Sequence, residues 1–391
     1  MMTHPRARRA VTLLALTVLA LAAAPARAEP RDPWVRSWGQ NNSGQVGNGS
    51  TLDQLTPSGV TGLARNDVRQ LTSGGWSTDQ VFALALLHDG TVRSWGGNVN
   101  GQLGNGTTAN RPFPAAVAGL SGVSRVAAGL DFALAVRGGR VLSWGNDSYG
   151  QLGDGLPDPS APVTRPVAVQ SLNKVKDVSA GCQFALALRE DGTVWSWGRN
   201  HEGQLGLGTM TDRNTPQRIP GLENIVAVKA GCRHALALTA DHTVKAWGRG
   251  GNGELGNDGT ELSTSPVDVK HLEEVTEIFA GPYHNFALLD DGGVRAWGAN
   301  GAGQLGDGTK SGRTTPVPVL QPRGVVSLLP GWGFTLALLD DQSVVAWGDN
   351  DVGQLGDGST TPSLSPVVAL PAGSGTTRLA SATAWKTSYA Y

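Results

Sequence analysis

Short apolar runs alternate with glycine-rich polar segments from residue 34 to the end of the chain. In the unit spanning residues 178–219, the pattern predicts strands at 178–181, 184–188 and 193–198, and an outer strand after Pro216. An Asp-Gly pair supplies the hairpin turn between the second and third strands. The second strand carries only small and apolar residues, so we expect it to be buried on both faces. The unit therefore predicts a four-stranded antiparallel sheet.

The same unit recurs seven times. Each copy carries a Trp-Gly pair at the end of its third strand, followed by a loop that ends in Gly-Gln-Leu-Gly or a close variant. An outer proline follows each loop. The tryptophans of the pairs are Trp38, Trp95, Trp144, Trp197, Trp247, Trp297 and Trp347. A period near fifty residues is typical of repeat architectures. Four strands per repeat, seven times, predict an all-β fold, a seven-bladed β-propeller.

The two ends of the chain each supply part of a repeat. Residues 34–38 read as a third strand, whereas residues 379–391 read as inner and second strands. We expect these segments to form one shared blade that closes the ring and hides the open sheet edges. The predicted organisation is a single propeller domain over residues 29–391.

Residues 1–28 are typical of a signal peptide. Arg6, Arg8 and Arg9 form a basic segment, an alanine-rich apolar segment follows at 10–24, and a small-x-small cleavage pattern ends at Ala28. This predicts a secreted or periplasmic protein. Cleavage would remove four of the 31 basic residues and no acidic one, leaving a net charge of −5. An acidic surface disfavours nucleic acid, and no later apolar run is long enough to span a membrane.

The repeat resembles that of the regulator of chromosome condensation family. The resemblance is fullest at residues 197–209 and 230–238, and it covers essentially residues 34–391. The founder of that family exchanges nucleotide on a nuclear GTPase and binds chromatin. Its exchange face uses acidic and histidine residues in the loops after the inner strands. Here none of the positions directly after the inner-strand glycine is acidic, and Asp131 comes only one place later, so exchange activity is disfavoured and stays an alternative.

The chain is also similar in plan to the second class of secreted β-lactamase inhibitory proteins, which bind their target through loop aromatics on one propeller face. Four aromatic residues outside the Trp-Gly series fall in the loops after inner strands, which share one rim. These are Trp76, Tyr283, Trp332 and Trp385. Polar candidates on the same face are Asp131, Gln183, Arg233, Tyr149 and His201. The alternative is that the aromatics plug the channel mouth.

The remaining reactive residues predict little chemistry. Cys182 and Cys232 occupy the same position in adjacent repeats and could form a disulfide. His234 and His284 open second strands, where the family resemblance implies packed, hydrogen-bonded histidines. No metal, cofactor or catalytic site is expected.

We therefore predict a monomeric, non-enzymatic, secreted protein that binds a protein partner through one loop-lined face. An inhibitor of a secreted or periplasmic enzyme such as a β-lactamase is a narrower form of this prediction. A hydrolase or lyase acting at the channel mouth, and a cell-surface spacer, are the alternatives from other classes.

Overall fold

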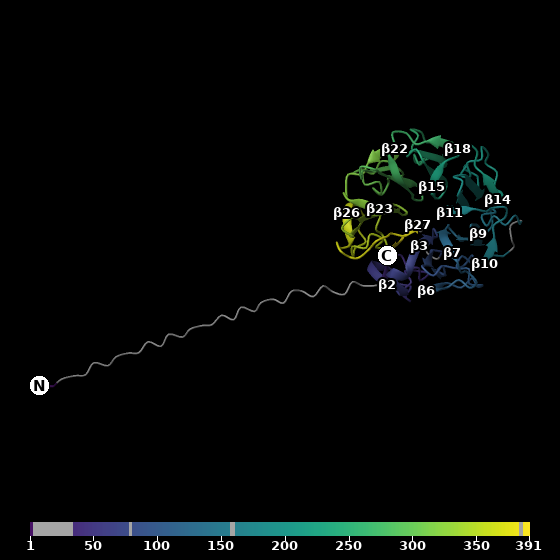
Figure 1. Cartoon of the computed structure of the whole chain (residues 1–391). Coiled ribbons are helices and arrows are strands. Elements are labelled where there is room, and N and C mark those ends of the chain that lie inside the picture. Colours follow the sequence, from purple (N-terminus) through teal and green to yellow (C-terminus); the bar gives the residue numbers. More distant parts are fainter. Residues whose placement is uncertain (3–33, 78–79, 157–160, 383–385) are drawn as a thin grey trace. The chain divides into compact units, whose positions relative to one another are not determined.

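Seven antiparallel sheets follow one another around a central channel in the described part of the chain (Figure 1). The computed structural model describes residues 1–2, 34–77, 80–156, 161–382 and 386–391, without the side chains of 34, 381 and 382. The predicted signal peptide falls almost entirely outside these residues. The predicted all-β propeller with seven blades is confirmed. No helix among the described residues is long and apolar enough to cross a bilayer.

Each blade begins with an inner strand at the channel, followed by a second strand. The inner strands are β3 (Val68–Gly74), β7 (Val123–Ala128), β11 (Val175–Ala180), β15 (Ile225–Ala230), β19 (Val275–Ala280), β23 (Val325–Pro330) and β27 (Ser381–Ala382). The second strands are β4 (Phe82–Leu87), β8 (Phe132–Arg137), β12 (Phe184–Arg189), β16 (His234–Thr239), β20 (His284–Leu289), β24 (Phe334–Leu339) and β28 (Thr387–Ala390).

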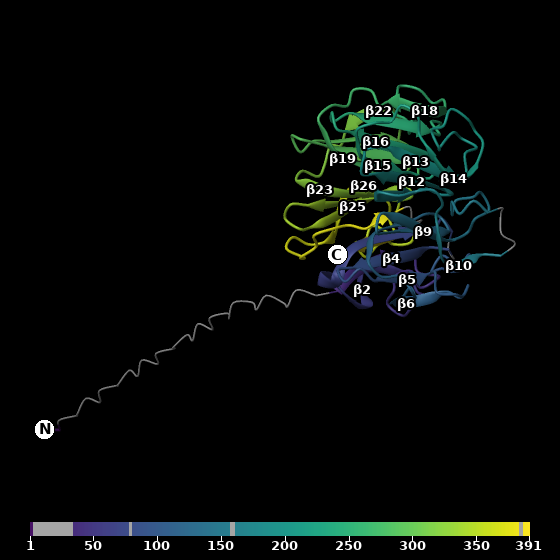
Figure 2. The same ribbon diagram turned by 45° about the vertical axis from the view of Figure 1, so that its right-hand side comes forward.

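The third and outer strands complete each blade, and most of the outer strands lie toward the edge of the molecule in Figure 2. The third strands are β1 (Trp34–Gly39), β5 (Val92–Gly96), β9 (Arg140–Gly145), β13 (Val194–Gly198), β17 (Val244–Gly248), β21 (Val294–Gly298) and β25 (Val344–Gly348). The outer strands are β2 (Gln54–Ala64), β6 (Arg111–Ala116), β10 (Val163–Ala168), β14 (Arg213–Arg218), β18 (Ser263–Asp268), β22 (Arg313–Pro318) and β26 (Ser363–Leu370). A short 3-10 helix, η1 (Arg65–Asp67), joins β2 to β3.

The outer strands begin slightly earlier than the sequence pattern predicts. Pro216 was expected to precede its strand, but it lies inside β14. The register between β13 and β14 is interrupted between Ser196 and Gly198. A proline is tolerated there because an outer strand has no further neighbour that would need its N–H group.

Neighbouring blades pack a large apolar face against a small one. In β12, Phe184 and Leu186 point to the next blade, where they meet Ala235 and Ala237 of β16 together with Trp247. Successive residues of a strand point to opposite faces, so the alternation of large residues and alanine gives each second strand one bulky and one flat side. The prediction that these strands are buried on both faces is confirmed.

The Trp-Gly tryptophans bind consecutive blades together. The indole N–H of Trp197 donates to the main-chain oxygen of Gln151 in the preceding blade, at 2.9 Å. The same bond joins every pair of neighbouring blades: Trp38 to Gln354, Trp95 to Gln45, Trp144 to Gln102, Trp247 to Gln204, Trp297 to Glu254 and Trp347 to Gln304. All seven indoles are fully buried, so each bond forms away from competing water.

Two side chains of the repeat hold the loop that presents this oxygen. The side-chain oxygen of Gln204 accepts the main-chain N–H of Glu202 at 2.9 Å, and that of Asn200 accepts the N–H of Leu205 at 2.9 Å. The glycine after Leu205, Gly206, lies against the indole of Trp247 in a left-handed conformation with φ of 71°. The Asn and Gly-Gln-Leu-Gly elements of the repeat are therefore structural.

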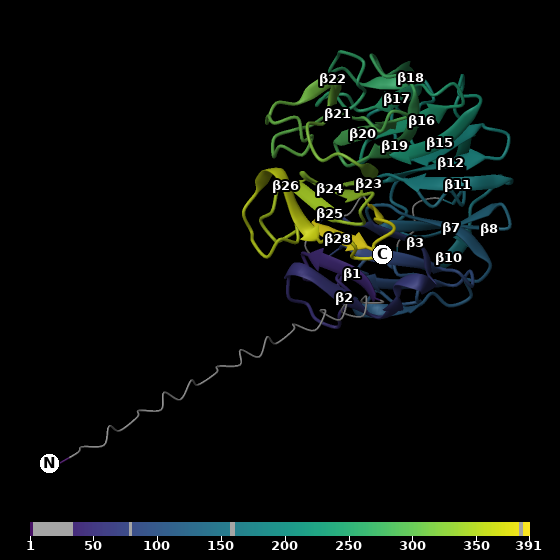
Figure 3. The same ribbon diagram turned by 60° about the vertical axis from the view of Figure 1, so that its left-hand side comes forward.

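The ring is closed by a blade that both ends of the chain build, as predicted. Strand β28 pairs with β1 in antiparallel register, for example Ser37 with Tyr389, and the two lie side by side in Figure 3. The inner strand of this blade differs from the expectation. Strand β27 is short and pairs in parallel with β3 of the neighbouring blade. A single antiparallel bridge, between Leu379 and Ala390, joins the inner segment to β28.

Substitution of Gly206 by Ala should lower the free energy of unfolding by about 2–4 kcal/mol, because an added Cβ would lie 2.9 Å from the Trp247 indole nitrogen and the backbone is left-handed. The matched control is Gly221→Ala. Gly221 has the same φ of 71° but open space around it, so only the backbone strain of about 1 kcal/mol is expected. Denaturant unfolding of both variants measures the difference. Equal losses would contradict the role assigned to the indole contact.

Candidate functional site

One face of the propeller is made of two sets of residues, those that follow the inner strands and those that follow the third strands. We call it the loop face. Side chains from the two sets contact each other around the ring. Arg233 donates to Glu202 at 2.6 Å, and Lys386 forms an ion pair with Asp349 at 2.9 Å. Both pairs join adjacent blades, so the loop face is a single, cross-linked surface.

Five residues pack together at the channel mouth on this face, and we call them the mouth cluster. Buried Leu130, Cys182 and Cys232 pack together, and half-buried Tyr283 and Trp332 pack against them. Cys182 and Cys232 form a disulfide with a Cα–Cα distance of 4.5 Å. The sequence left open whether the loop aromatics bind a partner or plug the channel mouth. The buried sides of Tyr283 and Trp332 pack into the mouth cluster, as the second interpretation predicts.

Main-chain hydrogen bonds connect the blades beneath the mouth cluster. The N–H of Leu130 donates to the oxygen of Cys182 at 3.2 Å, and the N–H of Cys182 to that of Cys232 at 3.1 Å. The N–H of Cys232 in turn donates to the oxygen of Pro282 at 3.2 Å. Pro282 has no N–H group, so it cannot extend the series. Four consecutive blades are thus tied together at the mouth.

Two aromatic pairs lie on the loop face, each beside an arginine. Tyr283 and Trp332 meet edge to face with ring centres 5.1 Å apart, and the guanidinium of Arg249 lies 5.2 Å from the Tyr283 ring. Tyr149 and His201 form a similar pair at 5.7 Å. Arg199 lies 5.0 Å from the Tyr149 ring and also donates to Gln183 at 2.7 Å. These contacts hold the aromatic side chains in defined orientations.

The remaining predicted residues differ in accessibility. Trp76 is 49% exposed, and His201 is also exposed. Asp131 is buried, where its carboxylate accepts a hydrogen bond from Asn146 at 2.7 Å. Burial raises the pKa of Asp131 to about 6. Its visible role is to join the two loops of its own blade. Trp385 lies outside the described residues.

Comparison with known proteins decides the family. Residues 139–391 match the model of the RCC1-like domain. Residues 35–78 and 89–136 match the regulator of chromosome condensation (RCC1) repeat. The chain belongs to this family. The resemblance noted in the repeat is confirmed over nearly the whole propeller.

This RCC1-like chain spans less than a third of the length of the curated relatives described next. The ultraviolet-B receptor UVR8 of Arabidopsis thaliana is 32% identical over 185 residues, which are 47% of this chain and 30% of the receptor. The E3 ubiquitin-protein ligase HERC2 of Homo sapiens is 30% identical over 190 residues, which are 47% of this chain and 4% of the ligase. Each match spans less than a third of the relative.

Solved structures share the fold. Prp20p from Saccharomyces cerevisiae superposes with a TM-score of 0.79 at 21% identity, over 91% of this chain and 90% of that one. Human WBSCR16 superposes with a TM-score of 0.79 at 22% identity, over 92% and 98% of the two chains. At this level of identity the likeness concerns the fold alone.

Sequence reasoning missed three residues of the loop face: Arg199, Arg249 and Glu202. The available signal was positional, because Arg199 and Arg249 directly follow a Trp-Gly pair, in the set of loops that the sequence had already placed on this face. The sequence could not give the distances of these arginines from the aromatic rings, because each ring comes from a neighbouring blade.

Two histidines of the RCC1-like repeat are core residues. His234 and His284 are buried at the start of β16 and β20, where other blades carry phenylalanine. His234 donates to the side-chain oxygen of Asn285 at 2.7 Å. His284 lies 3.2 Å from the hydroxyl of Thr335, which itself donates to the oxygen of Gln304. Among the described residues, no group of three or more His, Cys, Asp or Glu could hold a metal ion.

Replacing His284 with Phe should make the propeller less sensitive to acid. Burial lowers the pKa of His284 to about 3, whereas its ordinary value is 6.5. The unfolded chain therefore binds a proton below pH 6.5 that the folded chain does not, and stability falls by about 1.4 kcal/mol per pH unit toward pH 3.

Unfolding at pH 7 and pH 4 tests this. The His284→Phe variant should resemble the wild type at pH 7 and be more stable by about 2–3 kcal/mol at pH 4. A variant that differs from the wild type equally at both pH values would show that the histidine contributes only packing.

Proposed function

We propose that this RCC1-like propeller binds a protein partner through its loop face. The observation that carries the proposal is the set of aromatic and arginine side chains held in fixed orientations there, together with the exposed indole of Trp76. Tryptophan, tyrosine and arginine dominate the binding energy of protein interfaces. Side chains that are already ordered lose little conformational entropy when a partner binds.

Related propellers support a protein as the class of partner. Yeast RCC1 (Prp20) has been solved bound to Kap60, and Prp20p has been examined for binding to Gsp1p and histones. Those partners belong to those proteins. What carries over is that a propeller of this family can act as a protein-interaction module.

The proposal favours binding over nucleotide exchange and over catalysis. Asp131, which lies one place after the positions that the family uses for exchange, is buried and accepts hydrogen bonds from Asn146 of its own blade and Asn100 of the preceding blade. The described charged residues of the loop face are largely paired with each other, as in Arg233 with Glu202 and Lys386 with Asp349. Such pairs stabilise loops and are poor general acids or bases, because each partner holds the other in its charged form.

The narrower proposal is that the protein is exported and inhibits an enzyme outside the cytoplasm. The leader-like pattern of residues 1–28 supports export. A disulfide between Cys182 and Cys232 also fits an oxidising compartment. A β-lactamase is one enzyme of this kind, suggested by the similarity in plan to the secreted β-lactamase inhibitory proteins.

Removing the exposed aromatics of the loop face should weaken partner binding. The partner is first captured from the envelope and secreted fractions of the source organism and then titrated against purified variants. Trp76→Ala and Trp332→Ala should each weaken binding by about tenfold. The matched control is Phe113→Ala on the outer strand β6, because Phe113 is 48% exposed and Trp76 is 49% exposed. If only the control weakens binding, the partner docks on the circumference and the loop face is wrongly assigned.

The inhibitor proposal has its own measurement. The chain without residues 1–28 is added to purified secreted β-lactamases, and hydrolysis of a chromogenic β-lactam is followed. We expect dose-dependent inhibition that Trp332→Ala relieves and Phe113→Ala does not. Unchanged hydrolysis across the panel would remove β-lactamase from the proposal and leave the broader binding role standing.

A further inference from the structure

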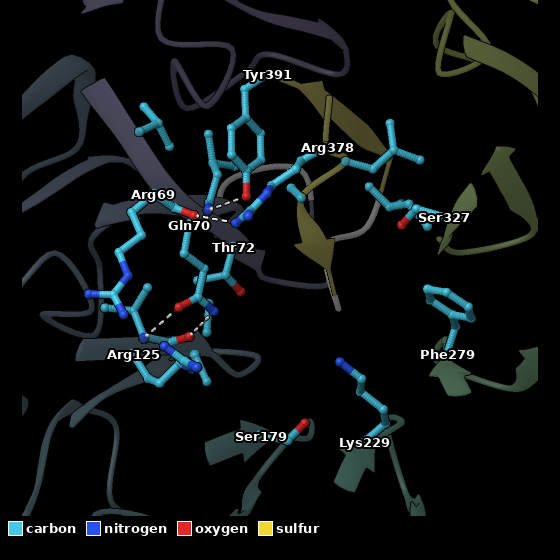
Figure 4. A pocket seen from close by; sticks show the side chains of 18 of the residues that line it. Arg69, Gln70, Thr72, Arg125, Ser179, Lys229, Phe279, Ser327, Arg378 and Tyr391 are labelled. Atoms are coloured by element: carbon cyan, nitrogen blue, oxygen red, sulfur yellow. Dashed lines mark hydrogen bonds between the residues drawn. The ribbon is translucent and has the colours of Figure 1, made fainter. Parts of the chain in front are cut away.

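The central channel contains a cavity of 1150 Å³ that is separate from the loop face. The inner strands and residues 375–380 line it (Figure 4). Toward the loop face its lining ends at Ala128, Ala180, Ala230 and Ala280, two or three residues before the positions that form the mouth cluster. At the other end the lining includes exposed residues such as Asn66. The cavity therefore lies beneath the mouth cluster and extends to exposed residues on the opposite side, and we call it the funnel.

The lining is cationic although the whole chain carries a net charge of −1. Five cationic side chains face two carboxylates around the described wall, which leaves a charge of +3. The cations are Arg65, Arg69, Arg125, Lys229 and Arg378, and the carboxylates are Asp177 and Glu277. They come from different blades, so the ring geometry alone brings them together. A narrow cleft lined by charge of one sign concentrates the field inside it.

Part of this charge is satisfied within the protein. Arg125 lies 3.7 Å from Asp177, and Arg378 donates to the main-chain oxygen of Arg69 at 2.8 Å. Arg65 donates to the oxygen of Ser374 at 3.0 Å. The main-chain oxygen of Tyr391 accepts the N–H groups of Thr377 and Arg378. These contacts hold the residues at the rim of the funnel in place. They do not involve the cationic groups of Arg69 and Lys229.

For Arg69 and Lys229, by contrast, the described residues supply neither a hydrogen bond nor an ion pair to the cationic group. Both are half-buried and line the cavity from β3 and β15 (Figure 4). Glu277 is the carboxylate that acts electrostatically on Lys229. The channel walls strip water from Glu277, which raises the pKa of its carboxyl, whereas the positive charge of Lys229 lowers it.

Two neutral polar side chains of the wall, Gln70 and Ser179, already have partners. The Gln70 side chain donates to the oxygen of Val126 at 2.8 Å and accepts its N–H at 3.1 Å, which bridges β3 and β7. Ser179 accepts the N–H of Ala230 at 2.9 Å. Among the charged side chains of the described wall, the cationic ends of Arg69 and Lys229 are the groups free to engage a ligand.

We propose that the funnel binds a small organic polyanion, a molecule that carries two or more carboxylate or phosphate groups. Arginine pairs with carboxylate and phosphate through a planar fork of donors, and lysine adds a second point charge. Phe279 supplies an apolar part of the wall against which a carbon skeleton can pack. The volume of 1150 Å³ slightly exceeds the range of about 300–1,000 Å³ found for small-molecule sites, so a small anion would fill only part of the funnel. This site is independent of the proposed partner on the loop face.

Calorimetric titration of the chain without residues 1–28, with citrate and with pyrophosphate, tests the proposal. Glucose serves as the neutral probe. We expect saturable binding of at least one of the two anions, no binding of glucose, and loss of affinity as salt is added. Lys229→Gln and Arg69→Gln should each weaken the anion by about tenfold, as expected for one lost charge-assisted hydrogen bond. Lys310→Gln makes the same change at an exposed position outside the cavity and should leave affinity unchanged.

Each result decides the proposal. Thermal unfolding of every variant without ligand confirms that it is folded, and Arg69→Lys replaces Arg69→Gln if the latter is not. Absence of binding by both anions overturns the proposal, as does equal weakening by Lys310→Gln. Tight binding of an acidic peptide with no binding of citrate or pyrophosphate also overturns it, because the funnel would then receive a segment of another protein. Loss of anion binding in Trp332→Ala, a loop-face variant, would contradict the separation of the two sites.

Discussion

Seven hydrogen bonds from buried indole N–H groups to main-chain oxygens of the preceding blade hold the propeller together. A buried indole needs an acceptor, and the loop must present its oxygen in one orientation to provide it. The glutamine, the asparagine and the close-packed glycine of each repeat serve that orientation. Because the last of these bonds joins Trp38 to Gln354, the two ends of the chain are held by the same contact as every other pair of blades.

This constraint separates the frame from the surfaces that can vary. The residues that make the frame repeat in nearly every blade, so they carry no information about a partner. The loop face and the channel differ from blade to blade. On the loop face, aromatic pairs and arginines are ordered by contacts within the protein, such as Arg199 with Tyr149. In the channel, cations from separate blades are brought into one cavity and only partly neutralised.

The repeat period, the four strands and the closing blade could all be predicted from the sequence, because each rests on local patterns that recur. Details set by contacts between blades were less predictable. The short β27 pairs with β3, which no local pattern indicates. The histidines of β16 and β20 were placed in the core, but their partners Asn285 and Thr335 come from the next blade. The aromatic candidates of the loop face were found, whereas Arg249, which lies beside Tyr283, was not.

The sequence by itself determined the fold, because each of the seven amphipathic units buries its apolar face against its neighbour, and a closed ring leaves no such face exposed at either end. It also determined which residues belong to the frame. Only the tertiary structure decided what the variable residues do, since their neighbours are supplied by other repeats about fifty residues away. It buried Asp131, joined Cys182 to Cys232, and left Trp76 exposed. It also gathered Arg69 and Lys229 in one funnel, because inner strands that are distant in the chain line the same axis.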